Sequence, residues 1–274
     1  MRTCPAAALV VCALASLSAC GGSEPGSGHH AVGTYAGPLH VARTAATHPS
    51  AGAAGDVVDC DAWGDGGSSG DGVYAEGATA DSPSGALETA RGEGGFGGVQ
   101  EGLQVAREED DRVLYVVEVG GVVKEAVVVH DGPATEGAGG PGWYVESWAT
   151  CDYSELPRSF TDSIGLQIWS DAHGDPAPTS AIESWKGPEH CDWQSMTFLS
   201  LGQAEYVRNP ERGLDDFFAG PYREHAVLPD DAVDTGFERD GDHLWLSPDK
   251  ERAYVGTSQD VEVWPSTVQP LGCD

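Results

Sequence analysis

The chain has 274 residues, and its 14 Lys and Arg against 44 Asp and Glu give a formal net charge of −30 at pH 7. A surface with this charge repels nucleic-acid phosphates and anionic lipid headgroups, which excludes nucleic-acid binding as a function. No glycine-rich loop precedes a helix in the way that nucleotide phosphates require, so we predict neither a nucleotide nor any other cofactor.

The first residues follow the order of an export signal. Arg2 precedes an apolar run over residues 5–17, and small residues stand before Cys20. The apolar run is too short to cross a membrane as a helix. We therefore interpret residues 1–19 as a signal peptide.

The end of this segment, Leu17-Ser18-Ala19-Cys20, resembles the lipobox of bacterial lipoproteins. The resemblance implies cleavage before Cys20 and attachment of lipid, palmitate included, to that cysteine. A diacyl anchor of this kind would hold the protein at the outer face of the cell membrane. The alternative is an ordinary secretory signal that is cut near Ala19.

The rest of the chain is predicted to form an α+β, strand-rich fold of two small lobes with antiparallel sheets. Residues 20–34 are rich in Gly and Ser and predict a flexible tether. Residues 35–157 predict an α+β lobe with one helix and about four strands. Residues 158–274 predict a second, strand-rich lobe.

The first lobe begins with strand-like residues 35–43 and contains one clear helix signal. Ser82 is a good N-cap, Pro83 suits the first helical position, and Gly92 suits the helix end. The apolar face of this helix consists of Ala86, Leu87 and Ala90. The strands that follow are predicted over residues 102–108, 111–119, 122–130 and 142–151. Gly120-Gly121 predicts a tight hairpin turn between the second and third of them.

An acidic, glycine-rich segment over residues 59–72 predicts a loop before the helix. Calcium prefers hard oxygen ligands in flexible loops, so this segment is a weak candidate calcium site, although its spacing departs from the EF-hand pattern. The candidate ligands are Asp59, Asp61, Asp65 and Asp71.

The second lobe alternates short apolar segments with polar turns. Residues 166–185 predict two strands around a polar turn, and residues 191–202 are compatible with a helix or a strand. Residues 243–258 predict a hairpin with an exposed turn at 247–251. The remaining segments are 204–210, the acidic stretch 210–225, and 260–265.

Seven cysteines reduce to four after processing. Cys4 and Cys12 lie in the signal peptide, and Cys20 is the predicted lipid site. An even number of remaining cysteines in an exported protein predicts two disulfides, with three pairings open. Cys60–Cys151 with Cys191–Cys273 is the favoured pairing, and a Cys151–Cys191 bond is its main rival.

A short motif occurs twice, as ESWATCDY at 146–153 and as ESWKGPEHCDW at 183–193. Glu146 and Glu183 are therefore weak candidates for an acid–base pair, and the neighbouring Trp residues for a sugar-stacking surface. The competing interpretation is structural: Trp packs over a disulfide, Glu points to water, and the motif joins the two lobes.

The body resembles uncharacterised lipoproteins of high-GC bacteria, most distinctively in PEHCDWQSMTFL at 188–199. This resemblance implies no molecular role. We expect a protein without catalytic activity that binds an envelope component or carbohydrate, or serves a structural role, at the cell envelope. The alternative is a secreted hydrolase that acts on cell-wall carbohydrate.

Overall fold

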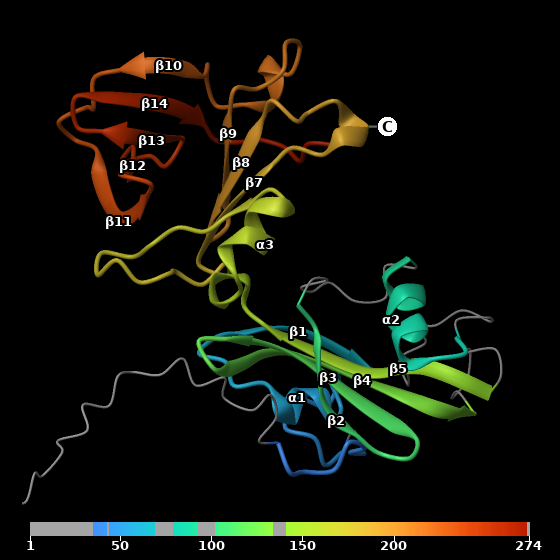
Figure 1. Cartoon of the computed structure of the whole chain (residues 1–274). Coiled ribbons are helices and arrows are strands. Elements are labelled where there is room, and N and C mark those ends of the chain that lie inside the picture. Colours follow the sequence, from blue (N-terminus) through green and yellow to red (C-terminus); the bar gives the residue numbers. More distant parts are fainter. Residues whose placement is uncertain (1–34, 43, 69–78, 93–101, 134–140, 273–274) are drawn as a thin grey trace, which may run out of the picture. The chain divides into compact units, whose positions relative to one another are not determined.

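The computed structural model describes residues 35–42, 44–68, 79–92, 102–133 and 141–272 (Figure 1). Every described residue belongs to one compact unit, Ala31–Asp274. Three antiparallel sheets and a few short helices make this unit α+β and strand-rich, as the sequence predicts.

The first sheet has the strand order β1-β5-β4-β3-β2. Its strands are β1 (Trp63–Ser68), β2 (Gln104–Glu108), β3 (Arg112–Val119), β4 (Val122–Pro133) and β5 (Pro141–Cys151). The four strands predicted from the sequence are confirmed as β2 to β5. Gly120 and Gly121 join β3 to β4 with φ of +62° and +83°, the left-handed conformation that a two-residue hairpin turn favours.

Helix α2 (Pro83–Gly92) covers one face of the first sheet. The Ser82 hydroxyl accepts a hydrogen bond from the Gly85 N–H at 3.1 Å, which confirms the predicted N-cap. The predicted apolar face of the helix packs on Val127, Val145 and Trp148 of the sheet.

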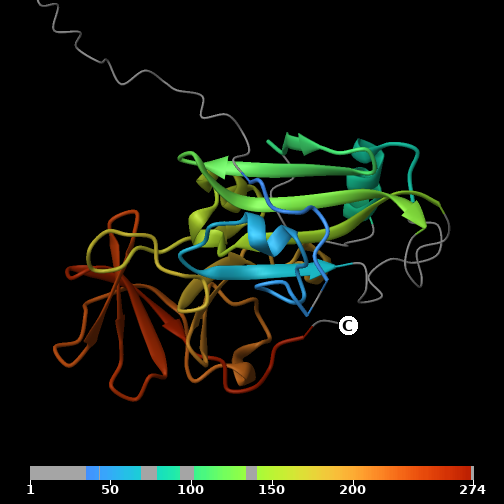
Figure 2. The same ribbon diagram turned by 90° about the horizontal axis from the view of Figure 1, so that it is seen from below.

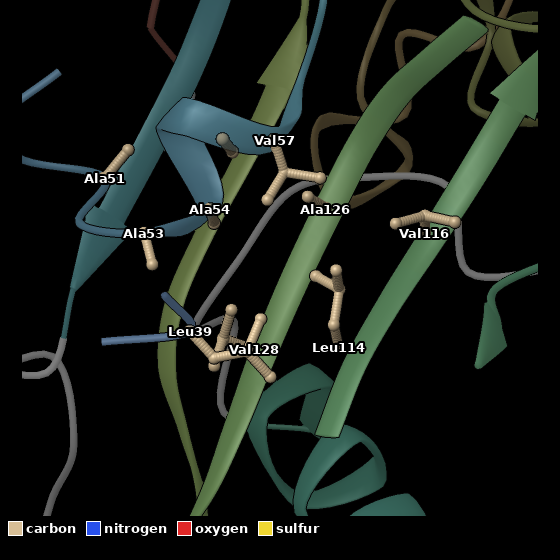
Figure 3. Packing of buried hydrophobic residues seen from close by; sticks show 10 residues of the cluster. Leu39, Ala51, Ala53, Ala54, Val57, Leu114, Val116, Ala126 and Val128 are labelled. Atoms are coloured by element: carbon tan, nitrogen blue, oxygen red, sulfur yellow. The ribbon is translucent and has the colours of Figure 1, made fainter. Parts of the chain in front are cut away.

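The opposite face of the first sheet packs against helix α1 (Ala54–Val57) and the chain around it (Figure 3). Leu39 fits between this segment and the sheet residues Leu114 and Val128, and all three are at most 1% exposed. A sheet buried on both faces requires nearly continuous apolar strands. This requirement accounts for the valine-rich sequences of β3 and β4.

Two expectations for the first lobe are wrong. Residues 35–42 form no strand, because Pro38 cannot donate to a ladder; instead, Arg107 Nη1 donates to the Gly37 carbonyl at 2.6 Å. Residues 63–68 are not a loop but β1, which pairs with β5. A Cβ on Gly64 would lie 2.4 Å from the Cys151 carbonyl oxygen, so glycine permits the close approach of the two strands.

A disulfide joins Cys60, just before β1, to Cys151 at the end of β5, with 5.3 Å between the two Cα atoms. This bond confirms the first favoured pairing and rules out the rival Cys151–Cys191 bond. Cys191 is also disulfide-bonded, and its predicted partner Cys273 lies outside the described residues. The second favoured pairing therefore stays a prediction.

The chain beyond Pro157 begins with helix α3 (Arg158–Ser163) and forms two more sheets. The second sheet contains β6 (Leu166–Gln167), β7 (Ile182–Lys186), β8 (Thr197–Leu201) and β9 (Ala204–Arg208), in that order. Within residues 191–202, the apolar part is therefore a strand, β8, and it follows a short 3-10 helix that ends at Cys191. Residues 171–175 form the predicted polar turn, in which Asp171 Oδ1 accepts from the N–H groups of His173 and Asp175.

The third sheet has the order β10-β14-β13-β12-β11. Its strands are drawn in orange and red in Figure 2. Its strands are β10 (Arg223–Ala226), β11 (Val233–Arg239), β12 (Asp242–Leu246), β13 (Arg252–Thr257) and β14 (Asp260–Pro265). The predicted hairpin over residues 243–258 is confirmed as β12 and β13. Strand β11 was not predicted, because its sequence VDTGFER contains too few apolar residues to show an alternation.

The second and third sheets face each other across a shared apolar core. Trp169, Ile182, Leu199 and Tyr206 contribute from the second sheet and its approach, and Leu244, Ala253, Val255 and Trp264 from the third. This arrangement is a two-sheet sandwich. The sandwich provides the framework for the cavity described below.

Candidate ligand cavity

The two copies of the repeated motif differ in structure. In the first, Asp152 is 4% exposed and accepts hydrogen bonds from the Ser154 N–H and from the N–H and hydroxyl of Thr179. It thus ties the end of β5 to the chain after α3. In the second copy, Asp192 has a φ of +59° and ends a short 3-10 helix. The repeated sequence motif therefore does not form the same structure, or the same kind of site, at its two positions.

A β-bulge positions Glu146 in the first copy. Val128 pairs with Ser147 and Val129 with Val145, so Glu146 is the extra residue of β5. A bulge of this kind turns consecutive side chains toward one face. Consistent with this, the Ser147 hydroxyl accepts from the Ala54 N–H in α1, while Glu146 contacts the first residue of β3.

Glu146 is held in an ion-pair network. Arg112 Nε donates to its Oε2 at 2.7 Å, and His40 Nδ1 lies 2.5 Å from its Oε1. Arg112 Nη1 also donates to Asp111 Oδ2 at 2.7 Å. Burial by itself would lower the pKa of Arg112, but the hydrogen bonds and charges of Glu146 and Asp111 raise it overall. The Glu146 side chain is only 12% exposed, so the expectation that it points to water is wrong.

Glu183 lies on β7, in a different sheet and among different neighbours. Burial, followed by the negative charge of Asp152, raises the pKa of Glu183. Across the strands it aligns with Ser200 and then Glu205, whose pKa is likewise raised by burial. Neither carboxylate has a hydrogen-bond or ion-pair partner among the described residues.

The structure does not bring Glu146 and Glu183 together. Asp152, whose charge acts on Glu183, follows Cys151 at the end of β5. Cys151 is roughly 16 Å from Glu146 at the ordinary rise of an extended strand. Paired glycosidase carboxylates lie about 5 to 9.5 Å apart. The two glutamates therefore do not form the acid–base pair that the hydrolase hypothesis requires.

The candidate calcium ligands are likewise dispersed. Asp65 lies within β1, where its Oδ1 accepts from the Gly66 N–H. The Lys124 ammonium donates to the Asp59 carbonyl, and Asp61 donates its N–H to Glu155. Asp71 lies outside the described residues. Within the described ranges, no group of three or more His, Cys, Asp or Glu side chains could hold a metal ion.

A cavity of about 400 Å³ opens at one end of the two-sheet sandwich. This volume falls in the range of small-molecule sites, about 300 to 1,000 Å³. Residues from both sheets and from the turns at their ends line it, as do the buried Trp169 and Trp264. Small-molecule sites often occupy such a position at the edge of an apolar core.

The third sheet changes from apolar to polar as its inner face approaches the cavity. Alternation along β14 puts Trp264 and Glu262 on the inner face, and Val255 of β13 pairs with Glu262. At the end of the sheet, Arg239 and Asp242 are cross-strand partners. Each of these side chains lines the cavity.

The second sheet shows the same change at the same end. Thr197 and Arg208 are cross-strand partners on β8 and β9, one step beyond the apolar pair Leu199 and Tyr206. Gln167 also lines the cavity. Inner faces of a sandwich are ordinarily apolar, because buried polar groups need hydrogen bonds. Matching polar ends on two facing sheets therefore mark a place that is suited to polar contacts.

Arg208 and Glu262 link the two sheets at the cavity wall. Arg208 Nε and Nη2 donate to Glu262 Oε2 and Oε1 at 2.6 and 2.7 Å, and Trp264 Nε1 donates to Oε2 at 2.8 Å. The hydrogen bonds to Glu262 raise the pKa of Arg208. Burial would raise the pKa of Glu262, but the donors Arg208 and Trp264 lower it overall. Both groups are therefore ionised at neutral pH.

A second set of hydrogen bonds lies along the part of the lining that the second sheet provides. Trp169 Nε1 donates to the Ser184 hydroxyl at 3.0 Å, and this hydroxyl donates to Gln167 Oε1 at 2.8 Å. The amide nitrogen of Gln167 makes no hydrogen bond to a described residue. Thr197 is 7% exposed, and its hydroxyl also has no partner among the described residues. The wall thus retains hydrogen-bonding capacity that a ligand could use.

No protein-family model matches the chain, and comparisons with curated proteins and with solved structures found no relative. The likeness to uncharacterised lipoproteins of high-GC bacteria therefore stays a prediction.

The sequence did not indicate the cavity, because its residues come from eight strands and their connections. The only local signal is a charged residue among the apolar residues of a strand, as with Arg208 at the end of AEYVR and Glu262 within DVEVWP. Recognising that these ends meet requires the pairing of the two sheets.

Proposed function

We propose that this protein is a lipid-anchored extracytoplasmic binding protein whose cavity at the end of the two-sheet sandwich holds a small polar ligand. The cavity carries the binding part of this proposal, because the inner faces of two sheets become polar at the same end and enclose a volume of ligand size.

The anchor part of the proposal rests on the lipobox resemblance of Leu17-Ser18-Ala19-Cys20. The Cys60–Cys151 disulfide supports an oxidising, extracytoplasmic location, since such bonds are rare in the reducing cytosol. Within the described part of the chain, no helix is both long enough and apolar enough to cross a membrane. The proposed attachment to the membrane is through the lipid on Cys20.

A labelling experiment tests the anchor. Cells that express the full chain are fed with labelled palmitate and then fractionated into membrane and soluble material. We expect label and membrane association for the wild-type chain and for Cys12→Ala, and the loss of both for Cys20→Ala. Cys12 is a matched control, because it lies in the same predicted signal peptide. Label on Cys20→Ala would contradict the proposal.

A second experiment tests the cavity. Small molecules released from the cell envelope are fractionated, and each fraction is added to the purified full chain while its melting temperature is measured. A ligand of the folded state raises this temperature. We expect at least one fraction to stabilise the wild-type chain, and Asp242→Asn to reduce this effect. Equal stabilisation of both chains would place the ligand elsewhere.

The hydrolase alternative lacks its proposed carboxylate pair. Glu146 forms an ion pair with Arg112 on the first sheet, whereas Glu183 lies on β7 of the second sheet, near Asp152. Binding without chemistry is therefore the function that the geometry supports best.

A further inference from the structure

The cavity lining contains hydrogen-bond donors and acceptors as close neighbours. Arg239 and the acceptor Asp242 are cross-strand neighbours, and so are Arg208 and Thr197, which carries a hydroxyl group. A hydroxyl group both donates and accepts, so neighbouring hydroxyls on one ligand match such a wall better than a single charged group does.

The charge of the lining disfavours an anionic ligand. The carboxylates of the lining are Glu224, Asp242, Asp260 and Glu262, and its guanidinium groups are Arg208 and Arg239. Glu262 already neutralises Arg208 through two hydrogen bonds. The remaining carboxylates outnumber the remaining guanidinium group, and the whole chain carries a net charge of −30. A phosphate or carboxylate group would be repelled.

The lining also argues against a metal ion. Among the described residues, no three carboxylate, imidazole or thiol side chains converge as metal ligands. The guanidinium group of Arg239 lies in the same lining and would repel a metal cation. An anion and a metal ion are thus both disfavoured, and the unused donor groups of Gln167 and Arg239 favour a neutral ligand with acceptor oxygens over an organic cation.

Arg239 retains unused hydrogen-bonding capacity. Its Nε is buried and has no hydrogen-bond partner among the described residues, whereas its Nη2 lies 3.2 Å from Asp240 Oδ2. Buried donors normally find acceptors, so a ligand oxygen that draws this guanidinium group toward the cavity would satisfy it. Val255 and the two tryptophans supply the apolar part of the lining.

We propose that the ligand of this cavity is a neutral carbohydrate. A sugar combines several hydroxyl groups with an apolar C–H surface and carries no charge. This inference rests on the proposed binding function of the cavity and specifies its ligand class.

The test is a binding titration with the full chain, purified in a detergent whose headgroup is not a sugar. The probes are neutral mono- to trisaccharides of glucose, mannose, galactose and N-acetylglucosamine, together with spermidine and inorganic phosphate. Tryptophan fluorescence and calorimetry report binding. We expect a saccharide to bind with saturation, and spermidine and phosphate not to bind.

Variants of the cavity localise the binding. We expect Asp242→Asn and Thr197→Val each to weaken saccharide binding at least tenfold. Glu238→Gln is the matched control: Glu238 is on the same hairpin as Asp242, its side chain faces His243, and it does not line the cavity. The control should bind like the wild-type chain.

The other outcomes separate this inference from the proposed function. Binding of spermidine or phosphate alone, weakened by Asp242→Asn, would overturn the carbohydrate class and keep the binding function. Saccharide binding that both cavity variants leave unchanged would overturn the assignment to this cavity. If no probe binds and no envelope fraction shifts the melting temperature, both proposals fail.

Discussion

Arg112–Glu146 on the first sheet and Arg208–Glu262 between the second and third sheets are the same chemical pair in different surroundings. The first pair has side chains that are 15% and 12% exposed, and it is also in contact with His40 and Asp111. The second pair is 45% and 22% exposed and borders a cavity. The first sheet is covered on both faces, whereas the sandwich leaves one polar end open.

The difference shows that a charged pair inside a fold does not by itself identify a site. On the first sheet every charged group of the network has a partner within the protein. At the cavity, Gln167, Thr197 and Arg239 retain capacity for further hydrogen bonds. The open end of the sandwich is therefore the better candidate for ligand binding, and the first sheet provides a stable body.

The largest expected effect concerns the disulfide that closes the first sheet. Replacing Cys60 and Cys151 by Ala together opens a loop with a sequence separation of 91. The chain-entropy relation predicts a loss of about 4 to 5 kcal/mol in the free energy of unfolding. Urea denaturation of the double variant measures this loss. A loss below about 1 kcal/mol would show that the bond adds little to this region.

The second prediction compares the two arginines directly. Arg112→Met leaves Glu146 buried without its main partner, which we expect to cost about 3 to 5 kcal/mol of stability. Arg208→Met exposes Glu262 to the cavity and its water, and should cost about 1 kcal/mol or less. Urea denaturation distinguishes the two. Adding Glu146→Gln to Arg112→Met should recover part of the lost stability, because it removes the unpaired charge. Equal losses of stability for Arg112→Met and Arg208→Met would contradict the difference between the two pairs.

The third prediction concerns the buried carboxylate at the end of β5. Burial would raise the pKa of Asp152, but hydrogen bonds from Thr179 and Ser154 lower it overall. A lowered pKa stabilises the fold above the ordinary value near 3.8, and this contribution is lost as the pH falls through the folded-state pKa. Asp152→Asn should therefore destabilise the protein by about 1 to 3 kcal/mol at pH 7.

Thermal unfolding between pH 3 and pH 7 measures this dependence on Asp152. The difference between the wild-type chain and Asp152→Asn should narrow toward pH 3. A difference that does not change with pH would mean that only the shape of the side chain matters.

The smallest effect has the opposite sign. Burial raises the pKa of Glu183, so its ionised form is less favourable in the folded protein than in the unfolded chain. The fold is relatively more stable below the ordinary pKa of Glu and loses stability as the pH rises through the raised value. Glu183→Gln should stabilise the protein at pH 7 by a few tenths of a kcal/mol, because the side chain is partly exposed.

Glu205→Gln should behave like Glu183→Gln, since burial also raises the pKa of Glu205. Calorimetry at pH 7 and pH 4 measures the stability of each variant relative to the wild-type chain, and it therefore shows whether the stabilisation at pH 7 disappears at pH 4. Destabilisation by either glutamine at pH 7 would mean that the carboxylate makes a favourable contact in solution.

The sequence predicted those elements that local chemistry determines. The Ser82 and Pro83 pair started a helix, the glycine pair at 120 and 121 made a turn, and strands β2 to β5 followed from valine-rich segments. The Cys60–Cys151 bond was part of the favoured pairing among the three that four cysteines allow.

The sequence failed where tertiary contacts determine the outcome. Strand β1 is a strand only because its glycines allow close contact with β5 and Trp148. Glu146 was expected to face water, but the bulge in β5 turns it toward Arg112. The cavity forms where the polar ends of two facing sheets meet. No pattern within a single segment of the sequence predicts that meeting.

The most direct test of the central claim is amide hydrogen exchange of the full chain with and without a saccharide that binds in the titration. The account predicts slower exchange around Thr197, Arg208 and Arg239–Asp242, with no change around Arg112 and Glu146. Protection at the first sheet, with the open end of the sandwich unaffected, would contradict it.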